Sequence, residues 1–402
     1  MTSELNPAQM LKERPTADLS RLSTRALLFG GVGAAACAAG FFMVDWSQFL
    51  QSYLIAYMFW LGLTLGSLAL LMIQHLSGGA WGLVGRRIFE AATRTLPLMA
   101  VLFLPIAMNM QTLYLWARPE AANDAILVTK QAYLNVNFFY VRAVLYFVVW
   151  MALAFTLSKW SKAQDESAPL EPGRMDRRFR VLSGPGLVLF MLSVTFMSVD
   201  WVMSLDPHFY STIFGVLTVG GQCLATIAFT ILTLQALSHA KPISDVTNAE
   251  RFHDYGKLML AFVMLWAYFN VSQLLIIWSA NLPEEIPWYI ERLRGHWGPW
   301  AVFVLVGHFV APFVLLLSRD LKRHGRTLSY VALFILFMRV VDLVWTVGPV
   351  FRHESTGHWL DFAMVAGMSL PWLFLFYSNL GSRALVPAHD PYFKESVISE
   401  GH

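Results

Sequence analysis

From Leu328 to Val350 the chain reads LSYVALFILFMRVVDLVWTVGPV, an apolar stretch with Arg339 and Asp342 at its middle. A helix of this length can cross the hydrocarbon core of a bilayer. An ionisable side chain at that depth costs about 3 kcal/mol on insertion scales, and it persists where it faces the bundle interior and has a partner. The spacing of three residues places both charges on one helix face, where they can pair. The stretch therefore predicts a membrane-spanning helix with a buried charged face.

The composition of the whole chain agrees with a membrane protein. Of its 402 residues 56% are hydrophobic and only 14% are charged, whereas a soluble domain averages about 25% charged residues. Ten apolar stretches approach membrane-spanning length, so the expected fold class is all-α and integral to the membrane. The ten stretches are 26–43, 51–74, 95–115, 138–157, 184–204, 212–236, 257–280, 298–317, 327–350 and 359–380.

The distribution of basic residues predicts the orientation of these helices. Most of the 29 lysines and arginines fall in the N-terminal arm, in the loops after even-numbered helices and in the C-terminal tail. Because positive residues accumulate on the cytoplasmic side, we expect both termini in the cytoplasm. The polar segment Met1–Arg25 lacks an apolar core and is not expected to act as a signal peptide. The net charge of +3 reflects this topology and does not indicate nucleic-acid binding.

The cysteines and histidines argue against a redox centre held by this chain. Cys37 and Cys223 are its only cysteines, whereas an iron–sulfur cluster needs about four thiolates. A membrane haem b needs two histidines that face each other, and His308 alone lies near the middle of a predicted helix. We therefore expect no metal and no haem bound by the chain itself.

The sequence contains pairs of similar short stretches that predict an internal repeat. FMVDW at 42–46 resembles FMSVDW at 196–201, and LMAVLF at 98–103 resembles LMLAFV at 258–263. The expected architecture is two related four-helix bundles with two peripheral helices. Its boundaries are an N-terminal arm at 1–25, a first repeat at 26–158, a linker at 159–183, a second repeat at 184–320, and two extra helices with the tail at 321–402.

Polar residues within the predicted helices lie mainly in the outer half of the membrane. This bias is typical of a polar cavity that opens outward or of the outer part of a proton route. The candidates for proton exchange are Arg339, Asp342, His308, Asp200, Asp361 and Arg142. Each also has a structural interpretation, because residues near a helix end can reach the interface and isolated polar groups can bridge helices.

Three segments together resemble a known family. They are HDYGKLMLAFVMLWAYFNVSQLLIIWSANLPEEIPWYIERLRGHW at 253–297, MRVVDLVW at 338–345 and SVTFMSVDWVMSLDPHFYSTIFG at 193–215. They are similar to the ActF-type membrane component of bacterial alternative complex III, a quinol:electron-acceptor oxidoreductase. That component belongs with the NrfD-like membrane anchors of polysulfide reductase and nitrite reductase. The resemblance covers almost the whole chain after Arg25.

The resemblance implies a role in respiratory or photosynthetic electron transport across the bacterial inner membrane. The complex takes electrons from menaquinol or ubiquinol. The implied partners are a quinol-binding homologue of this chain, an iron–sulfur subunit related to molybdopterin enzymes, a multihaem cytochrome c, other proteins of the complex and lipid. Haem c and iron–sulfur clusters belong to these partners, so this chain is expected to bind no redox metal and not to be catalytic alone.

Four functional hypotheses remain open from the sequence. The first is a proton path coupled to quinol oxidation by partner subunits. The second is a quinol-binding anchor, in which Asp200 or His208 accepts the quinol proton and aromatic side chains hold the ring. Asn270 and Gln273 are further candidates for quinone binding. The third is a secondary transporter with parallel repeats. The fourth is a structural scaffold in which the buried charges are sealed.

Overall fold

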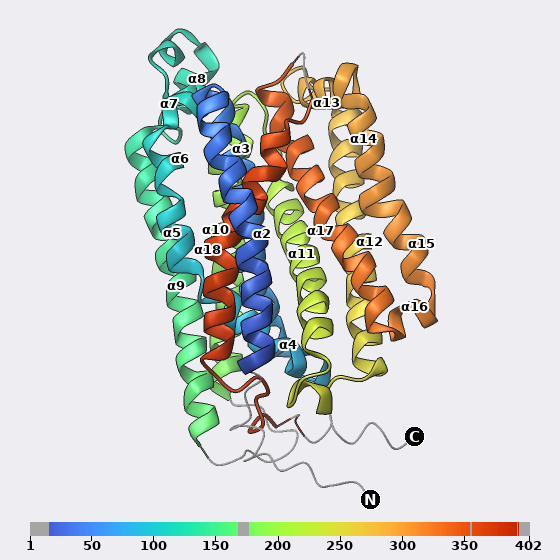
Figure 1. Ribbon diagram of the computed structural model, residues 1–402. Helices are drawn as coiled ribbons and strands as arrows, with labels where there is room; N and C mark the ends of the chain where they lie inside the picture. Colours follow the sequence, from blue (N-terminus) through green and yellow to red (C-terminus); the bar gives the residue numbers. More distant parts are fainter. Residues whose placement is uncertain (1–15, 168–176, 354–355, 392, 394–402) are drawn as a thin grey trace, which may run out of the picture.

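The computed structural model describes residues 16–167, 177–353, 356–391 and 393, and their regular secondary structure is helical throughout (Figure 1). Within these residues, ten helical segments are long and apolar enough to cross a membrane. The chain is therefore an all-α, multi-pass membrane protein, as the sequence predicts. The ten segments are Asp18–Met43, Trp46–Ser77, Trp81–Met108, Val136–Glu166, Arg177–Leu205, Phe214–Leu237, Ala249–Ala280, Gly295–Leu317, Gly325–Val350 and Trp359–Gly381.

The two ends of the bundle differ in what they carry. Figure 1 shows that α2 (Thr16–Met43) begins and α18 (Trp359–Gly381) ends at the same end, where α4 (Ala80–Thr93) also lies. We call this the basic end, because most of the lysines and arginines predicted to lie between helices belong to it. The opposite end carries two short helices, α8 (Ala125–Lys130) and α13 (Ile286–Leu293).

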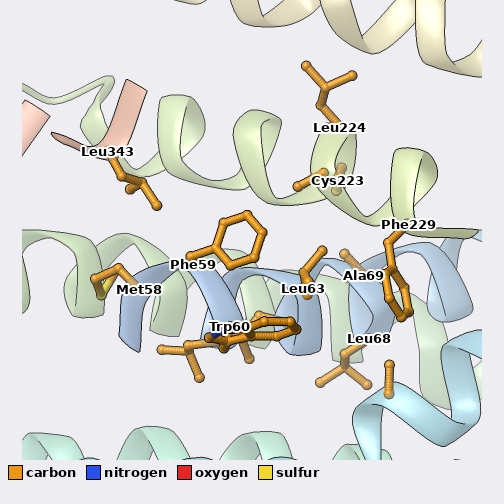
Figure 2. Packing of buried hydrophobic residues seen from close by; sticks show 14 of the residues in the cluster. Met58, Phe59, Trp60, Leu63, Leu68, Ala69, Cys223, Leu224, Phe229 and Leu343 are labelled. Carbon is orange, nitrogen blue, oxygen red and sulfur yellow. The ribbon is translucent and has the colours of Figure 1, made fainter. Parts of the chain in front are cut away.

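The centre of the molecule is the contact between α3 (Trp46–Ser77) and α11 (Phe214–Leu237). Figure 2 shows Phe59 and Leu63 pointing toward the helix that carries Cys223. A Cβ atom on Gly66 would lie 2.5 Å from the carbonyl oxygen of Gln222, so only glycine permits this approach. Close backbone approach through small residues is how helices associate where no water drives them together.

The helices pack as two bundles. The first bundle contains α3, the α4–α7 segment, α9 (Val136–Glu166) and α10 (Arg177–Trp201). The second contains α11, α12 (Ala249–Ala280), the segment from α14 (Gly298–Val304) to α15 (Ala311–Leu317), and α17 (Gly325–Val347). The remaining two membrane-spanning helices, α2 and α18, pack along each other.

This packing corrects the predicted grouping of 26–158 and 184–320. The first helix lies outside the first bundle and the ninth helix lies inside the second. Helix α2 instead uses its glycines to approach α18, since a Cβ on Gly33 would lie 2.4 Å from the carbonyl carbon of Ala366. The ninth helix, α17, carries Arg339 and Asp342 and packs against α11, where both charges are buried.

Three boundaries differ from the prediction because helices extend into the polar segments that flank the predicted spans. The third span, predicted at 95–115, begins as α4 and continues as α5 (Leu96–Leu102), α6 (Leu104–Met108) and α7 (Met110–Leu113). Pro97 and Pro105 coincide with these interruptions, since proline cannot donate the helical hydrogen bond. The predicted linker 159–183 is largely helical, because α9 reaches Glu166 and α10 begins at Arg177, while residues 168–176 lie outside the described residues. The predicted arm 1–25 is already helical from Thr16.

Arg86 and Arg87, predicted to lie in a loop, are buried in α4 by an ion network at the basic end. Glu90 accepts from Arg86 Nε at 3.0 Å, from Arg87 Nη1 at 2.7 Å and from Ser161 Oγ at 2.6 Å. Arg86 Nη1 also donates to Asp390 at 2.7 Å, which ties the tail to this bundle. Buried charges are tolerated where each has such partners.

Candidate functional site

The charged pair of α17 faces the interior of the second bundle. Arg339 is 8% exposed and Asp342 is 4% exposed, and Arg339 Nη1 donates to Asp342 Oδ2. The guanidinium lies against Gly221 of α11, where an added Cβ would be 2.5 Å from its carbon. Gly221 therefore makes the space that the arginine occupies. The two residues are therefore paired and buried, as their spacing of three residues indicates.

His308 lies beside this pair on the neighbouring helix. It belongs to a π-helical turn, Leu305–Val310, and is fully buried. Pro312 lies four residues later and has no N–H to donate to the His308 carbonyl, which accounts for the local change of helix type. His308 Nδ1 is 3.9 Å from Asp342 Oδ2, and the Trp266 ring centroid is 4.3 Å from that of the imidazole.

Neither ring nitrogen of His308 has a hydrogen-bond partner among the described residues. A separation of 3.9 Å is too long for a direct bond between His308 and Asp342, so proton exchange between these two groups requires a bridging water. Such a position, next to an ion pair and at an irregular helical turn, is suited to proton exchange.

A cavity of about 60 Å³ extends from the ion pair toward the opposite end. One water needs roughly 10–15 Å³ of such space, so a few waters fit. Both amide atoms of Gln222 are buried without a partner among the described residues, which leaves polar atoms for water to bind. The polar and aromatic residues of the lining are Phe214, Thr218, Gln222, Trp266, Asn270, Gln273, Trp288, Tyr289, Arg339, Asp342, Trp345 and Thr346.

Helix α13 covers the outer part of this cavity. Gln273 Nε2 donates to the Tyr289 hydroxyl at 3.1 Å, and the Trp288 ring stacks on Phe209 at 4.2 Å. Arg292 is fully buried, and its Nη2 donates to the carbonyl oxygen of Thr346 at 2.7 Å. Burial lowers the pKa of Arg292 to about 9, so the guanidinium stays charged at neutral pH.

Thr346 links α13 to the charged pair. Its carbonyl oxygen accepts the bond from Arg292, and its Oγ1 donates to the Asp342 carbonyl oxygen at 2.8 Å. Hydrogen bonds therefore hold the backbone of α17 at the carbonyl oxygens of both Asp342 and Thr346. The cover formed by α13 is attached to the helix that carries the ion pair.

An apolar groove of about 210 Å³ adjoins the polar cavity. Trp266, Asn270, Tyr289 and Trp345 line both spaces. The groove is otherwise lined by apolar side chains of α12, α13 and α14, several of them exposed on the face that a membrane would cover. This arrangement joins a hydrogen-bonding cavity to an apolar channel of the kind that an amphiphile can occupy.

The first bundle holds a separate charged cluster. Arg142 Nε and Nη2 donate to the two carboxylate oxygens of Asp200 at 2.8 and 3.0 Å, and the Tyr146 hydroxyl donates to Asp200 at 2.7 Å. The guanidinium carbon also lies 3.9 Å from the Tyr133 ring centroid. A bidentate pair with an aromatic cover and a further hydroxyl satisfies both charges. Arg142 and Asp200 do not line the cavity of the second bundle.

Asp361 lies apart from both clusters. Its carboxylate accepts from Arg352 at 2.7 and 2.9 Å and from Ser52 Oγ at 2.6 Å. The backbone N–H of His358 donates to the same carboxylate at 2.9 Å. These bonds connect α18 to α3 and to the loop after α17. The contacts describe a tie between helices and do not bring Asp361 to Asp342.

The residues of the quinol-binding hypothesis are also divided. His208 Nε2 lies 2.8 Å from Asp124 Oδ2 in the loops of the opposite end. Asn270 and Gln273 line the cavity of the second bundle, whereas Asp200 belongs to the first. The structure therefore brings together Arg339, Asp342 and His308 with Asn270 and Gln273, and it leaves Asp200 and His208 elsewhere.

Sequence reasoning misses several residues of this site. Gln222 and Gly221 do not stand out as ionisable groups, although a Gly220-Gly221-Gln222 run inside an apolar helix signals close approach next to a buried amide. Arg292 counts as a loop charge by sequence, yet it is buried over the Trp288 ring, 3.0 Å from its centroid. No local pattern predicts that α13 folds back over the bundle.

Among the residues that the structure describes, no group of three His, Cys, Asp or Glu side chains is placed to hold a metal ion. The expectation that redox metals belong to partner subunits stays a prediction. A scan against models of known protein families found no match to this chain, and a search of curated proteins found no significant match.

Proposed function

We propose that the chain is an integral membrane subunit of a quinol:electron-acceptor oxidoreductase and that its second bundle carries protons. One observation supports this most strongly. The buried Arg339–Asp342 pair lines a cavity with room for water, and His308 lies beside the pair with no hydrogen-bond partner for either ring nitrogen in the described part of the chain. If the chain were a scaffold with sealed charges, no space for water would be expected beside the pair. If the pair faced lipid, no other polar side chains would be expected beside it.

In this proposal Asp342 exchanges a proton with cavity water while Arg339 stabilises its anionic form. His308 is the neighbouring group that accepts or returns the proton through a bridging water, since its nitrogen is 3.9 Å from the carboxylate. Asn270, Gln273 and Tyr289 order the water toward the opposite end. The closed contacts of Arg142, Asp200 and Asp361 leave these three residues outside the proposed route.

The orientation follows from charge. Because basic segments face the cytoplasm, the basic end is assigned to the cytoplasm of a bacterial inner membrane, with both termini on that side. The cavity then lies toward the outer compartment. Electrons would move through the partner subunits and protons through this chain.

The test uses vesicles that contain the chain with the proteins that co-purify with it. We replace the pair as Arg339→Met with Asp342→Asn, so that no unpaired charge remains, and measure protons moved per electron taken from quinol. The proposal predicts a lower ratio with a smaller loss of electron transfer. The matched control is Arg142→Met with Asp200→Asn in the first bundle, which should leave the ratio unchanged. An unchanged ratio in the second-bundle variant contradicts the proposal.

A second candidate function is quinol binding, and the apolar groove favours it. A quinol ring placed among Trp266, Tyr289 and Trp345 would meet Asn270, and its prenyl tail would follow the groove into lipid. Val302→Trp fills the groove from α14, where Val302 is exposed. We expect this change to reduce the amount of quinone that co-purifies, with Val314→Trp, exposed on α15, as control. Equal quinone content in both variants contradicts this candidate.

A further inference from the structure

A second cavity lies beside the first at the opposite end. It measures about 70 Å³ and is lined by Tyr210, Ser211, Thr212, Ile213, Gln273, Ile276, Ile277 and Glu285. Gln273 lines both cavities. The two spaces therefore meet at one side chain, and each is large enough for water.

The Gln273 amide is fixed between the two cavities. Its Oε1 accepts from Ser211 Oγ at 2.9 Å, and its Nε2 donates to the Tyr289 hydroxyl at 3.1 Å. Only 4% of the residue is exposed. Both ends of the amide are thus held by hydroxyl groups, which can donate to or accept from water on either side.

Glu285 is the carboxylate of the second cavity. It is 7% exposed and makes no ion pair with another described residue, in contrast to Asp200, Asp342 and Asp361. It lies on the loop just before α13, and its negative charge raises the pKa of Tyr210, an exposed residue of the same cavity. Its sequence neighbour, Glu284, is exposed.

We propose that Glu285 is the group that exchanges protons between the buried site and the outer medium. A proton leaves the water of the first cavity, passes along water held by the Gln273, Tyr289 and Ser211 side chains, and bonds to a carboxylate oxygen of Glu285. Glu285 then releases a proton to bulk water and returns to its anionic form. No oxidant or further reactant takes part. This inference rests on the proposed proton transfer through the second bundle.

The experiment compares Glu285→Gln with Glu284→Gln in vesicles that hold the chain and its co-purifying proteins. Quinol oxidation is started by a single addition of acceptor, and proton release is followed with a pH-sensitive dye. Loss of a positioned acid–base group slows proton transfer by roughly 10²-fold. We expect that slowing for Glu285→Gln, no change for Glu284→Gln, and partial recovery for Glu285→Asp.

The outcomes separate this inference from the proposed function. If the Arg339→Met, Asp342→Asn variant slows proton release and Glu285→Gln does not, the exit through Glu285 is refuted and the buried site stands. If neither variant changes proton release, the proposed function itself is refuted. Equal slowing by Glu284→Gln and Glu285→Gln would assign the effect to surface charge and overturn the inference. Failure of Glu285→Asp to recover any rate would also overturn it.

Discussion

Breaking the central ion pair should cost far more stability than replacing both partners. Asp342→Asn keeps the shape of the side chain, so its cost comes from the Arg339 charge that stays 8% exposed without a counter-ion. Removing one partner of a buried pair costs about 3–5 kcal/mol, whereas exchanging both for uncharged groups of similar volume is close to neutral. We therefore expect each single variant to lose about 3–5 kcal/mol and the double variant with Arg339→Met to lose about 1 kcal/mol or less.

The assay is equilibrium unfolding in detergent followed by tryptophan fluorescence, for which the chain offers 15 tryptophans. The four proteins of the cycle are compared under identical conditions, because non-additivity between contacting residues is the quantity of interest. Recovery of stability in the double variant supports a buried, mutually compensating pair. Additive losses would show that the two charges are independently solvated, and they would refute the paired geometry.

Three further predictions follow from other contacts. Gly221→Ala should displace the central guanidinium and lower proton transfer, whereas Gly62→Ala, whose added Cβ meets its nearest atom at 3.4 Å, should not. Glu90→Gln should lower the free energy of unfolding by about 3–5 kcal/mol, because it leaves two buried arginines without this carboxylate; a loss below about 1 kcal/mol would contradict the network. A hydrogen bond from His208 lowers the pKa of Asp124, so the contact stabilises the loop above the ordinary carboxyl pKa and is lost as the pH falls. The protection factors of the α8 amides, which correct for the intrinsic pH dependence of exchange, should therefore fall below about pH 4, and unchanged protection factors would contradict this.

The membrane-spanning helices are predictable from the sequence because the hydropathy of each helix depends only on its own residues. The stretch at 327–350 becomes α17 with its extension to Val350, and its two charges face inward as their spacing indicates. Each of these properties depends on residues within a few turns of one another. The cost of exposing a charge to lipid leaves few arrangements open.

The helix boundaries that differ from the prediction depend on residues that are far apart in the sequence. Arg86 and Arg87 count as loop charges by sequence, yet they lie in a helix because Asp390, Ser161 and Glu90 surround them. Asp390 lies about 300 residues away from Arg86 in the sequence, so no local sequence pattern predicts this ion pair. A count of charged residues identifies the type of each residue but does not identify its partner.

The candidate site is predictable only in part for the same reason. Arg339, Asp342 and His308 stand out as ionisable residues in apolar helices, and they lie together. Asp361 stands out equally, but its partner Arg352 lies in the loop after α17 and closes a separate pair. The cavity itself depends on Gln222 and on the cover formed by α13, which only the fold positions.

The most direct test of the account is an experimental density map of the second bundle that resolves ordered water. We expect an ordered water between Asp342 Oδ2 and His308 Nδ1 and further ordered waters along Gln273 toward Glu285. A dry space at these positions, with the Arg339–Asp342 pair sealed from Gln273, would contradict proton exchange here and leave the chain a structural role.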